Sequence, residues 1–268
     1  MRGRKLAFIG TGFMARAMIG GIVGAGVRRP DEIVTVNPVD PEGAAAVTAE
    51  YGVVRGEPSD IAGADAVIFA IKPQEFDNAV RMYGGYFTPD KLYLSIMAGI
   101  TTERIEDAVP GAAVVRLMPN MALSVAKSAV AYAPGKLADE GDCALTEELF
   151  GVMGKVLRVE EDEISLVTAV SGSGPAYFCL LAEEMAKAAA EAGMDPEVAE
   201  ALATQTLLGT AAILENTGVS AAELRRRVTS KKGTTEAALL AMADSGFGEA
   251  VSRGVEAAKN RSDELSRS

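Results

Sequence analysis

The chain has 268 residues, of which 49% are hydrophobic and 24% charged, and its 26 basic and 37 acidic side chains give a net charge of −11. This composition is that of a folded protein with one or two domains, and the negative charge argues against nucleic acids and anionic membrane surfaces as partners. The absence of histidine excludes an imidazole general base and a His-ligated zinc site, and we expect no metal site.

No apolar run approaches the roughly 18–20 residues of a membrane span, so we expect a cytoplasmic protein with no membrane partner. The two cysteines, Cys143 and Cys179, form no CxxC motif and have apolar neighbours in the sequence. Both are therefore expected to be buried thiols in a reducing compartment, and a single buried disulfide is the alternative.

Short β-rich segments recur through the first 160 residues, separated by stretches with helical periodicity or by turn residues. Alternating strands and helices indicate a parallel sheet with helices on both faces, so we predict an α/β fold with a doubly wound, Rossmann-type sheet. Strands are predicted at Lys5–Ile9, Glu32–Val36, Ala66–Ile71, Leu92–Ile96 and Ala113–Met118, with weaker ones at Ala129–Ala133 and Lys155–Val159.

After about Glu160 the sequence has helical spacing and is rich in Ala, Glu, Leu and Met. The chain thus divides into a dinucleotide-binding domain at 1–160 and an all-helical domain at 161–268. Helix Pro196–Glu215 is apolar around most of its circumference, so we expect a second subunit to cover it; a place inside a monomeric bundle is the alternative. Helices are predicted at Asp162–Ala192, Pro196–Glu215, Ala221–Arg227, Thr235–Ala243 and Phe247–Leu265, and the polar tail from Arg261 is expected to fray.

The first predicted strand runs directly into Gly10-Thr11-Gly12-Phe13-Met14-Ala15, a GxGxxA motif at a strand-to-helix turn. The first glycine permits the tight turn, the second lets the backbone approach a pyrophosphate, and the small third residue lets helix and strand pack closely. Free N–H groups at the helix N-terminus then hold the pyrophosphate. The motif predicts dinucleotide binding, against the alternative of a purely structural turn.

The second strand ends at Val36-Asn37-Pro38-Val39, where NAD-specific sites usually place an acid against the ribose 2′-hydroxyl. No acid stands there, and Asn37 can donate a hydrogen bond to a 2′-phosphate, so NADPH is the expected cofactor and NADH remains possible. Asp40 is close enough to matter if the loop folds back. The alternative interpretation of Asn37-Pro38 is an ordinary turn.

Polar residues also follow later strands, where ligands of open α/β sheets bind. Lys72 and Asn120 leave apolar strands at this rim, and each is as consistent with a solvated loop as with a ligand contact. The segment Ser171–Tyr177, SGSGPAY, interrupts a helical stretch and is either a helix break or a small-residue floor beside a ligand. The hydroxyl-rich loop 228–236 opens a helix whose N–H groups could bind a carboxylate, or it is simply a helix start.

Five segments, IGTGFMARA, AIKPQ, LMPNM, SGSGPAY and VTSKKGTTEAA, occur in the order and spacing of pyrroline-5-carboxylate reductases, and the chain resembles that family along essentially its whole length. The resemblance implies hydride transfer from NAD(P)H to the C=N bond of 1-pyrroline-5-carboxylate, giving L-proline in the last step of proline biosynthesis. It also implies a Rossmann domain followed by a helical substrate-binding and dimerisation domain, with interleaved helices in a homodimer and possibly larger rings.

The resemblance assigns roles to residues that match the family motifs. The expected catalytic residue is Thr235, placed to hydrogen-bond the ring nitrogen of the substrate. The substrate carboxylate is expected at Ser230, Gly233, Thr234 and Thr235. The expected cofactor-binding residues are Ile9, Gly10, Thr11, Gly12, Phe13, Met14, Asn37, Ala70, Ile71, Lys72, Pro73, Met97 and Ala98.

The chain departs from the family pattern at Lys232, where the family usually has a glycine. If that position needs a positive φ, lysine is strained there, although its charge could attract the substrate carboxylate. Two other functions are weighed: a related imine or β-hydroxyacid reductase, for which Lys187 is the candidate acid/base, and a non-catalytic NADPH-binding regulatory protein. NADPH binding without turnover would favour the regulatory protein.

Overall fold

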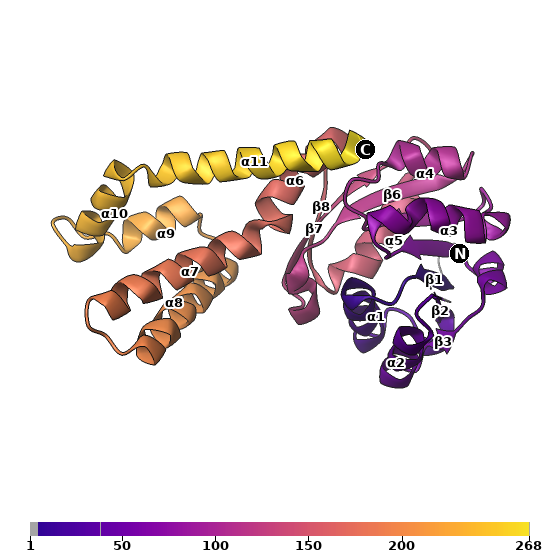
Figure 1. The fold of residues 1–268 in the computed structure, drawn as a ribbon, viewed down its shortest axis with the longest axis horizontal. Coiled ribbons are helices and arrows are strands. Elements are labelled where there is room, and N and C mark those ends of the chain that lie inside the picture. Colours follow the sequence, from indigo (N-terminus) through magenta and orange to yellow (C-terminus); the bar gives the residue numbers. More distant parts are fainter. Residues whose placement is uncertain (1–4, 38, 268) are drawn as a thin grey trace. The chain divides into compact units, whose positions relative to one another are not determined.

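The computed structural model describes residues 5–37 and 39–267. The chain forms two compact units, Met1–Gly172 together with Ala258–Ser268, and Ser173–Ala257 (Figure 1). The first unit is a sheet with helices on both faces and the second is entirely helical, so the predicted fold class is confirmed. The expected domain boundary at residue 160 lies 12 residues before the point where these compact units divide, since the first unit extends to Gly172.

The sheet of the first unit has eight strands in the order β3-β2-β1-β4-β5-β6-β7-β8, and all neighbouring pairs are parallel except β6 and β7. The order reverses between β1 and β4, which makes their carboxyl ends the switch point where open α/β sheets bind ligands. Strand β3 was not predicted, because its two residues are exposed and carry no apolar pattern. The strands are β1 (Leu6–Ile9), β2 (Ile33–Val36), β3 (Val54–Arg55), β4 (Ala66–Phe69), β5 (Leu92–Ser95), β6 (Ala113–Met118), β7 (Ser128–Pro134) and β8 (Gly154–Arg158).

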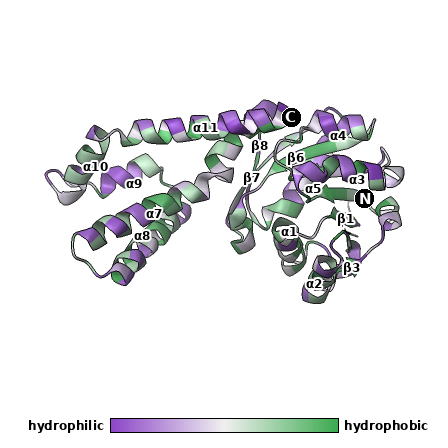
Figure 2. Ribbon diagram, in the orientation of Figure 1, coloured by the Kyte–Doolittle hydropathy of each residue, from purple (hydrophilic) through white to green (hydrophobic). Residues whose placement is uncertain are grey.

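Alternate residues of the central strands enter two separate hydrophobic cores, one on each face of the sheet. Helices α1 (Phe13–Gly24), α2 (Pro41–Tyr51) and α5 (Glu140–Gly151) pack on one core, and α3 (Phe76–Tyr83) and α4 (Thr102–Ala108) on the other. The strands are accordingly among the most hydrophobic parts of the ribbon (Figure 2). Burial on both faces explains why their sequences are almost wholly apolar.

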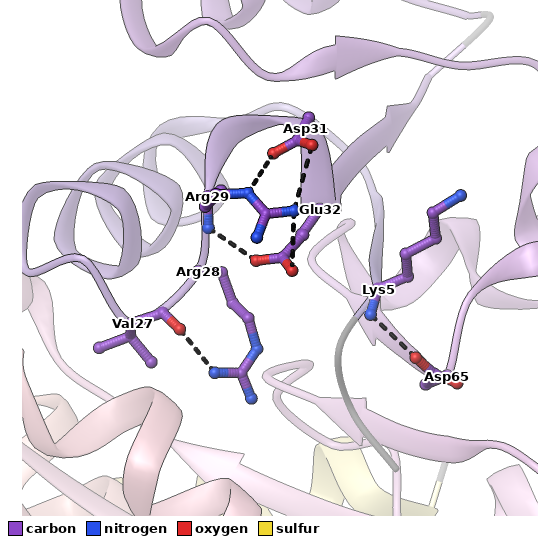
Figure 3. Close-up of polar contacts among 7 residues, drawn as sticks. All are labelled: Lys5, Val27, Arg28, Arg29, Asp31, Glu32 and Asp65. Carbon is purple, nitrogen blue, oxygen red and sulfur yellow. Dashed lines mark hydrogen bonds and ion pairs between the residues drawn. The ribbon is translucent and has the colours of Figure 1, made fainter. Parts of the chain in front are cut away.

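The entry into β2 is fixed by a local network of charges (Figure 3). The Arg29 guanidinium donates to Asp31 Oδ1 at 2.9 Å and lies 3.3 Å from Glu32 Oε1, while Glu32 Oε2 accepts the backbone N–H of Arg29 at 2.9 Å. The backbone N–H of Lys5 donates to Asp65 Oδ2 at 2.9 Å, which joins the beginning of β1 to the turn before β4. These contacts lie at the beginnings of β1 and β2 and at the turn before β4, opposite the carboxyl ends of the strands.

The second unit holds α7 (Gly174–Glu191), α8 (Pro196–Thr217), α9 (Ala221–Arg227), α10 (Thr234–Asp244) and the first half of α11 (Phe247–Arg267). The predicted end signals are present: Gly193 has a φ of 101°, and Asp195 and Ser220 cap α8 and α9 with their side chains. In the single chain only two alanines of α8 are buried, while Leu202, Leu208 and Ile213 are exposed. Green stretches along α7 and α8 show the same apolar surface (Figure 2).

The helix predicted at Asp162–Ala192 is present with a local change of winding. A turn at Glu161–Glu163 leads into α6 (Ile164–Val167), a π-helical segment follows at Thr168–Gly172, and α7 continues to Glu191. The π segment takes in Ser171 and Gly172, the first two residues of the SGSGPAY motif, and α7 begins at Gly174, so the chain continues as a helix past residues that favour a break.

Two expectations are wrong for the described chain. The tail from Arg261 does not fray, because α11 continues to Arg267 and its last residues pack on the first unit, with Ser262 buried. Cys143 is buried but Cys179 is exposed in the single chain, on the apolar surface of α7. Both thiols are unpaired, so the alternative of a disulfide is excluded for this structure.

The expectation of no membrane span is not contradicted, but one helix passes a test of length and composition. One described helical segment, Glu161–Glu191, is long and apolar enough to cross a membrane by length and composition. Serine, glycine and charged residues interrupt the segment, so it holds no continuous apolar run of that length. It is weak support for a span, since a core helix of an assembled soluble protein passes the same test.

Candidate cofactor and substrate sites

The glycine turn after β1 lies at the switch point of the sheet. Gly10 has a φ of 102°, and a methyl group on it would lie 2.6 Å from the carbonyl oxygen of Ala70, at the end of β4. The backbone therefore requires glycine here, for its conformation and for the close approach of the two strand ends. Ala15 is fully buried between α1 and the sheet, as the small third residue of the motif requires.

The N-terminus of α1 is open to a ligand. Gly12 is its N-cap residue, no side chain caps the helix, no acid lies in its first turn, and a methyl group on Gly12 would meet nothing within 4 Å. The free N–H groups and the helix dipole favour an anion at this point. This open, uncapped turn fits a dinucleotide pyrophosphate, and the roles of Thr11, Phe13 and Met14 stay predictions.

Asn37 lies directly beyond β2, and its side-chain amide donates to Thr11 Oγ1 at 2.7 Å. The structure thus brings the end of β2 against the glycine turn, with Thr11 buried. One amide donor of Asn37 is already used within the protein, which reduces what it can offer to a 2′-phosphate. The loop after it does fold back: the N–H of Asp40 donates to the carbonyl of Asn37 at 3.2 Å.

The other expected cofactor residues gather at the same edge of the sheet. Ile9 ends β1, Ala70 and Ile71 follow β4 beside Gly10, and Met97 and Ala98 follow β5. The N–H of Met97 is held by Ser95 Oγ at 3.3 Å. Lys72 is exposed and precedes the short helical turn that begins at Pro73. All of these residues belong to the first unit, so the structure brings the predicted cofactor residues together, and their roles stay predictions.

A groove of about 810 Å³ begins at Thr11 and Gly12 and follows α1 past Arg16 and Gly20. Arg16 forms an ion pair with Glu50 of α2, next to Tyr51. Burial raises the pKa of Tyr51, and its hydrogen bond to Glu50 raises it further, so the phenol stays protonated. The sequence did not indicate that Glu50 and Tyr51 of α2 line this groove. Gly20 was the one hint, because a methyl group at this position would lie 2.9 Å from the Tyr51 ring.

The side-chain amide of Asn120 is hydrogen-bonded within the protein at both ends. Its Oδ1 accepts the N–H of Ala122 at 3.1 Å, and its Nδ2 donates to the carbonyl of Ser171 at 3.1 Å. It therefore ties the end of β6 to the π-helical segment. Ser171, the first residue of the SGSGPAY motif, therefore has a structural contact within the first unit.

The expected substrate residues lie in the second unit, where a tight loop leads into α10. Gly233 is the N-cap residue of α10, no side chain caps the helix, and a methyl group on Gly233 would overlap Ser230 Oγ. Thr234 and Thr235 form the first turn, with Thr235 half-buried. The arrangement leaves backbone N–H groups and hydroxyls beside each other, which suits a carboxylate.

Lys232 in this loop has a φ of 59°, so it occupies the left-handed region that the departure from the family pattern put in question. Its N–H donates to Glu236 Oε2 at 2.6 Å, which holds the turn closed. Lys187, the candidate acid/base of the alternative reductases, is exposed on α7. Within the described residues no group of three or more Cys, Asp or Glu side chains is arranged to hold a metal.

Comparison with known proteins decides the family. A family model described as pyrroline-5-carboxylate reductase dimerisation matches residues 161–265, and one described as NADP oxidoreductase coenzyme F420-dependent matches residues 5–99. Pyrroline-5-carboxylate reductase 1 of Bacillus subtilis (strain 168) is 40% identical over 266 residues, which cover 98% of this chain and 90% of the relative. The chain belongs to the pyrroline-5-carboxylate reductase family.

Other relatives of the family agree over the full length. The pyrroline-5-carboxylate reductase of Methanosarcina acetivorans is 35% identical over 273 residues, covering 99% of each chain. The solved pyrroline-5-carboxylate reductase of Coxiella burnetii is 31% identical, with a TM-score of 0.90 and complete coverage of both chains. A Plasmodium falciparum pyrroline carboxylate reductase, solved with NADP bound, has the same fold, with 23% identity, a TM-score of 0.82 and 99% coverage of both chains.

Membership of the pyrroline-5-carboxylate reductase family confirms the predicted resemblance and the expected class, an NAD(P)H-dependent oxidoreductase. The match over 161–265 also supports self-association, since it covers the family's dimerisation region. This match begins at residue 161, whereas the compact helical unit begins at Ser173.

Proposed function

We propose that this chain reduces 1-pyrroline-5-carboxylate to L-proline with NAD(P)H, the last step of proline biosynthesis. Membership of the pyrroline-5-carboxylate reductase family over 98% of the chain carries the proposal. Two features of the residues support it: an open glycine turn for a pyrophosphate and a separate uncapped helix start for a carboxylate. Both suit a reaction between a dinucleotide and a small acid.

The cofactor would be held by the turn Gly10–Met14, with Asn37, the segment Ala70–Pro73, and Met97 and Ala98 around it. The bound nicotinamide supplies the hydride that reduces the C=N carbon. The protein has to orient the two reacting rings and exclude water, which requires no strongly basic group and is consistent with a chain that lacks histidine.

The substrate carboxylate would be bound by the N–H groups of the first turn of α10 together with Ser230 and Thr234. The half-buried hydroxyl of Thr235 would hydrogen-bond the ring nitrogen and orient it while that nitrogen becomes an amine. Within the described chain the Thr235 hydroxyl has no protein hydrogen-bond partner, so it is available to a ligand.

The test compares Thr235→Ala with Thr235→Ser in the full chain. We expect Thr235→Ala to lower kcat at least about tenfold while the Kd for NADPH stays unchanged, because the hydroxyl acts on the substrate. Thr235→Ser keeps the hydroxyl and should keep most of the activity. Equal turnover in all three proteins would remove Thr235 from the mechanism, and NADPH binding with no turnover in the wild type would favour the regulatory alternative.

For assembly we propose a homodimer whose α7 and α8 helices interleave, with larger rings built from dimers, in the cytoplasm. The exposed side chains of Leu202, Leu208 and Ile213 need such cover. Leu208→Glu should shift the protein toward monomer in analytical ultracentrifugation, because it would place a charge in that interface. A wild-type monomer at micromolar concentration would contradict the proposal.

A further inference from the structure

A single cluster joins the end of β2, the glycine turn and the start of α2. Asn37 donates to Thr11 Oγ1, and Asp40 caps α2 by accepting the N–H of Gly43 with Oδ1 at 2.9 Å. A methyl group on Gly43 would overlap Asp40 Oδ2 and lie 3.0 Å from Thr11 Oγ1. The Asp40 carboxylate therefore stands close to the Thr11–Asn37 pair, at the point where the ribose next to the adenine is read in this fold.

The charges around this cluster are predominantly negative. Asp40 and Glu50 line the groove on one side of the glycine turn, and Glu75 lines the small recess that contains Asn37 on the other. The one cation among these described lining residues is Arg16, which is paired with Glu50. No lysine or arginine of these two linings is left to balance an added phosphate.

From this cluster we infer that Asp40 acts as a specificity residue that disfavours the 2′-phosphate of NADPH relative to the 2′-hydroxyl of NADH. This inference rests on the proposed use of a nicotinamide cofactor. The N-terminus of α2 would otherwise be an anion site beside the ribose, but the Asp40 carboxylate already accepts the N–H of Gly43 there and adds a negative charge. A 2′-phosphate would meet that charge, whereas a 2′-hydroxyl can donate to it.

The inference is tested by direct binding, without turnover. ADP-ribose and its 2′-phosphate are titrated into the full-length protein by calorimetry at one fixed salt concentration, because the effect is electrostatic. The wild type should bind ADP-ribose more tightly. Asp40→Asn removes the charge but retains a good helix cap, and should tighten binding of the 2′-phosphate at least about fivefold while ADP-ribose changes little.

Asp139→Asn is the matched control, since Asp139 also caps a helix of the first unit, by accepting the N–H of Asp142 at 2.9 Å, but lies in neither lining. Asp40→Ser replaces Asp40→Asn if the latter misfolds by circular dichroism. An unchanged ratio of the two affinities in the Asp40 variant, or a wild type that prefers the 2′-phosphate, overturns the inference. Failure of both compounds to bind would instead count against the proposed cofactor.

Discussion

The end of α11 packs against the loop that follows β5, and a substitution at Gly99 tests this contact. Gly99 has a φ of 77°, and a methyl group on it would lie 2.7 Å from the carbonyl oxygen of Leu265. The left-handed conformation costs a non-glycine residue about 1–2 kcal/mol, partly offset by a stiffer unfolded chain. The overlap with a backbone atom adds about 1–3 kcal/mol, so Gly99→Ala should lower the free energy of unfolding by about 2–4 kcal/mol.

Gly26→Ala provides the matched control. Gly26 lies in the same unit with a φ of 70°, but a methyl group on it would meet nothing within 4 Å. It should therefore show only the conformational cost, about 1 kcal/mol. The assay is urea unfolding of both variants and the wild type at equal protein concentration, because the stability of a self-associating protein depends on concentration.

The difference between the two variants measures the contact with α11. An excess of at least about 1 kcal/mol for Gly99→Ala is expected. Equal destabilisation of the two variants would show that α11 does not lie against Gly99. The conclusion that the end of α11 packs on the first unit would then be wrong. Since Met97 and Ala98 are expected cofactor residues, the Gly99 variant should also weaken NADPH binding, whereas Gly26→Ala should not.

Four further outcomes follow from single contacts. Gly12→Ser should raise stability by a few tenths of a kcal/mol through a helix cap, yet raise the Kd for NADPH severalfold, by fluorescence titration. Lys232→Gly should stabilise the chain by about 0.5–1 kcal/mol in urea unfolding, because it relieves the left-handed φ. Arg116, 3% exposed, donates to Glu161 at 2.8 Å, so Arg116→Met should cost about 2–3 kcal/mol in urea unfolding and the added Glu161→Gln should recover most of it. Burial raises the pKa of Tyr93 to about 12, so the unfolded chain loses this proton at a lower pH than the folded chain does. The free energy of unfolding should therefore fall as the pH rises from about 10 to about 12, and less steeply in Tyr93→Phe.

The elements that the sequence predicted well are those whose pattern depends on local physics. Strands β1 and β4 are apolar on both faces, and α8 and α9 begin at side-chain caps, so residue types alone locate them. Strand β3 and the end of α11 depend on distant partners. The tail is polar along its length, and nothing in its own sequence indicates that the backbone of Leu265 meets Gly99.

The candidate site shows the same division. The glycine turn was predicted because its motif has a conformational cause, which Gly10 displays in the structure, whereas the loop before α10 was expected to bind the substrate only through the family resemblance. From the sequence, Asp40 was expected to matter only if the loop folds back toward Asn37. Whether it does depends on the conformation of the connection between β2 and α2. The charge that a ribose would meet therefore depends on the tertiary structure, although Asn37 and Asp40 are close in the sequence.

A chain with a net charge of −11 must bind two anionic molecules in the proposed reaction, and helix starts show how it can. Helices α2, α4, α5, α8 and α9 each begin with an acid or hydroxyl side chain that occupies their N–H groups. Helices α1 and α10 begin instead after a glycine with no cap. These two are the helices that follow the expected cofactor turn and the expected substrate loop. Free backbone donors favour an anion at each of these two points, and at α10 the exposed Lys231 and Lys232 add positive charge beside Glu236 of its first turn. Such local sites explain why the net charge of the chain does not reveal an anion-binding protein.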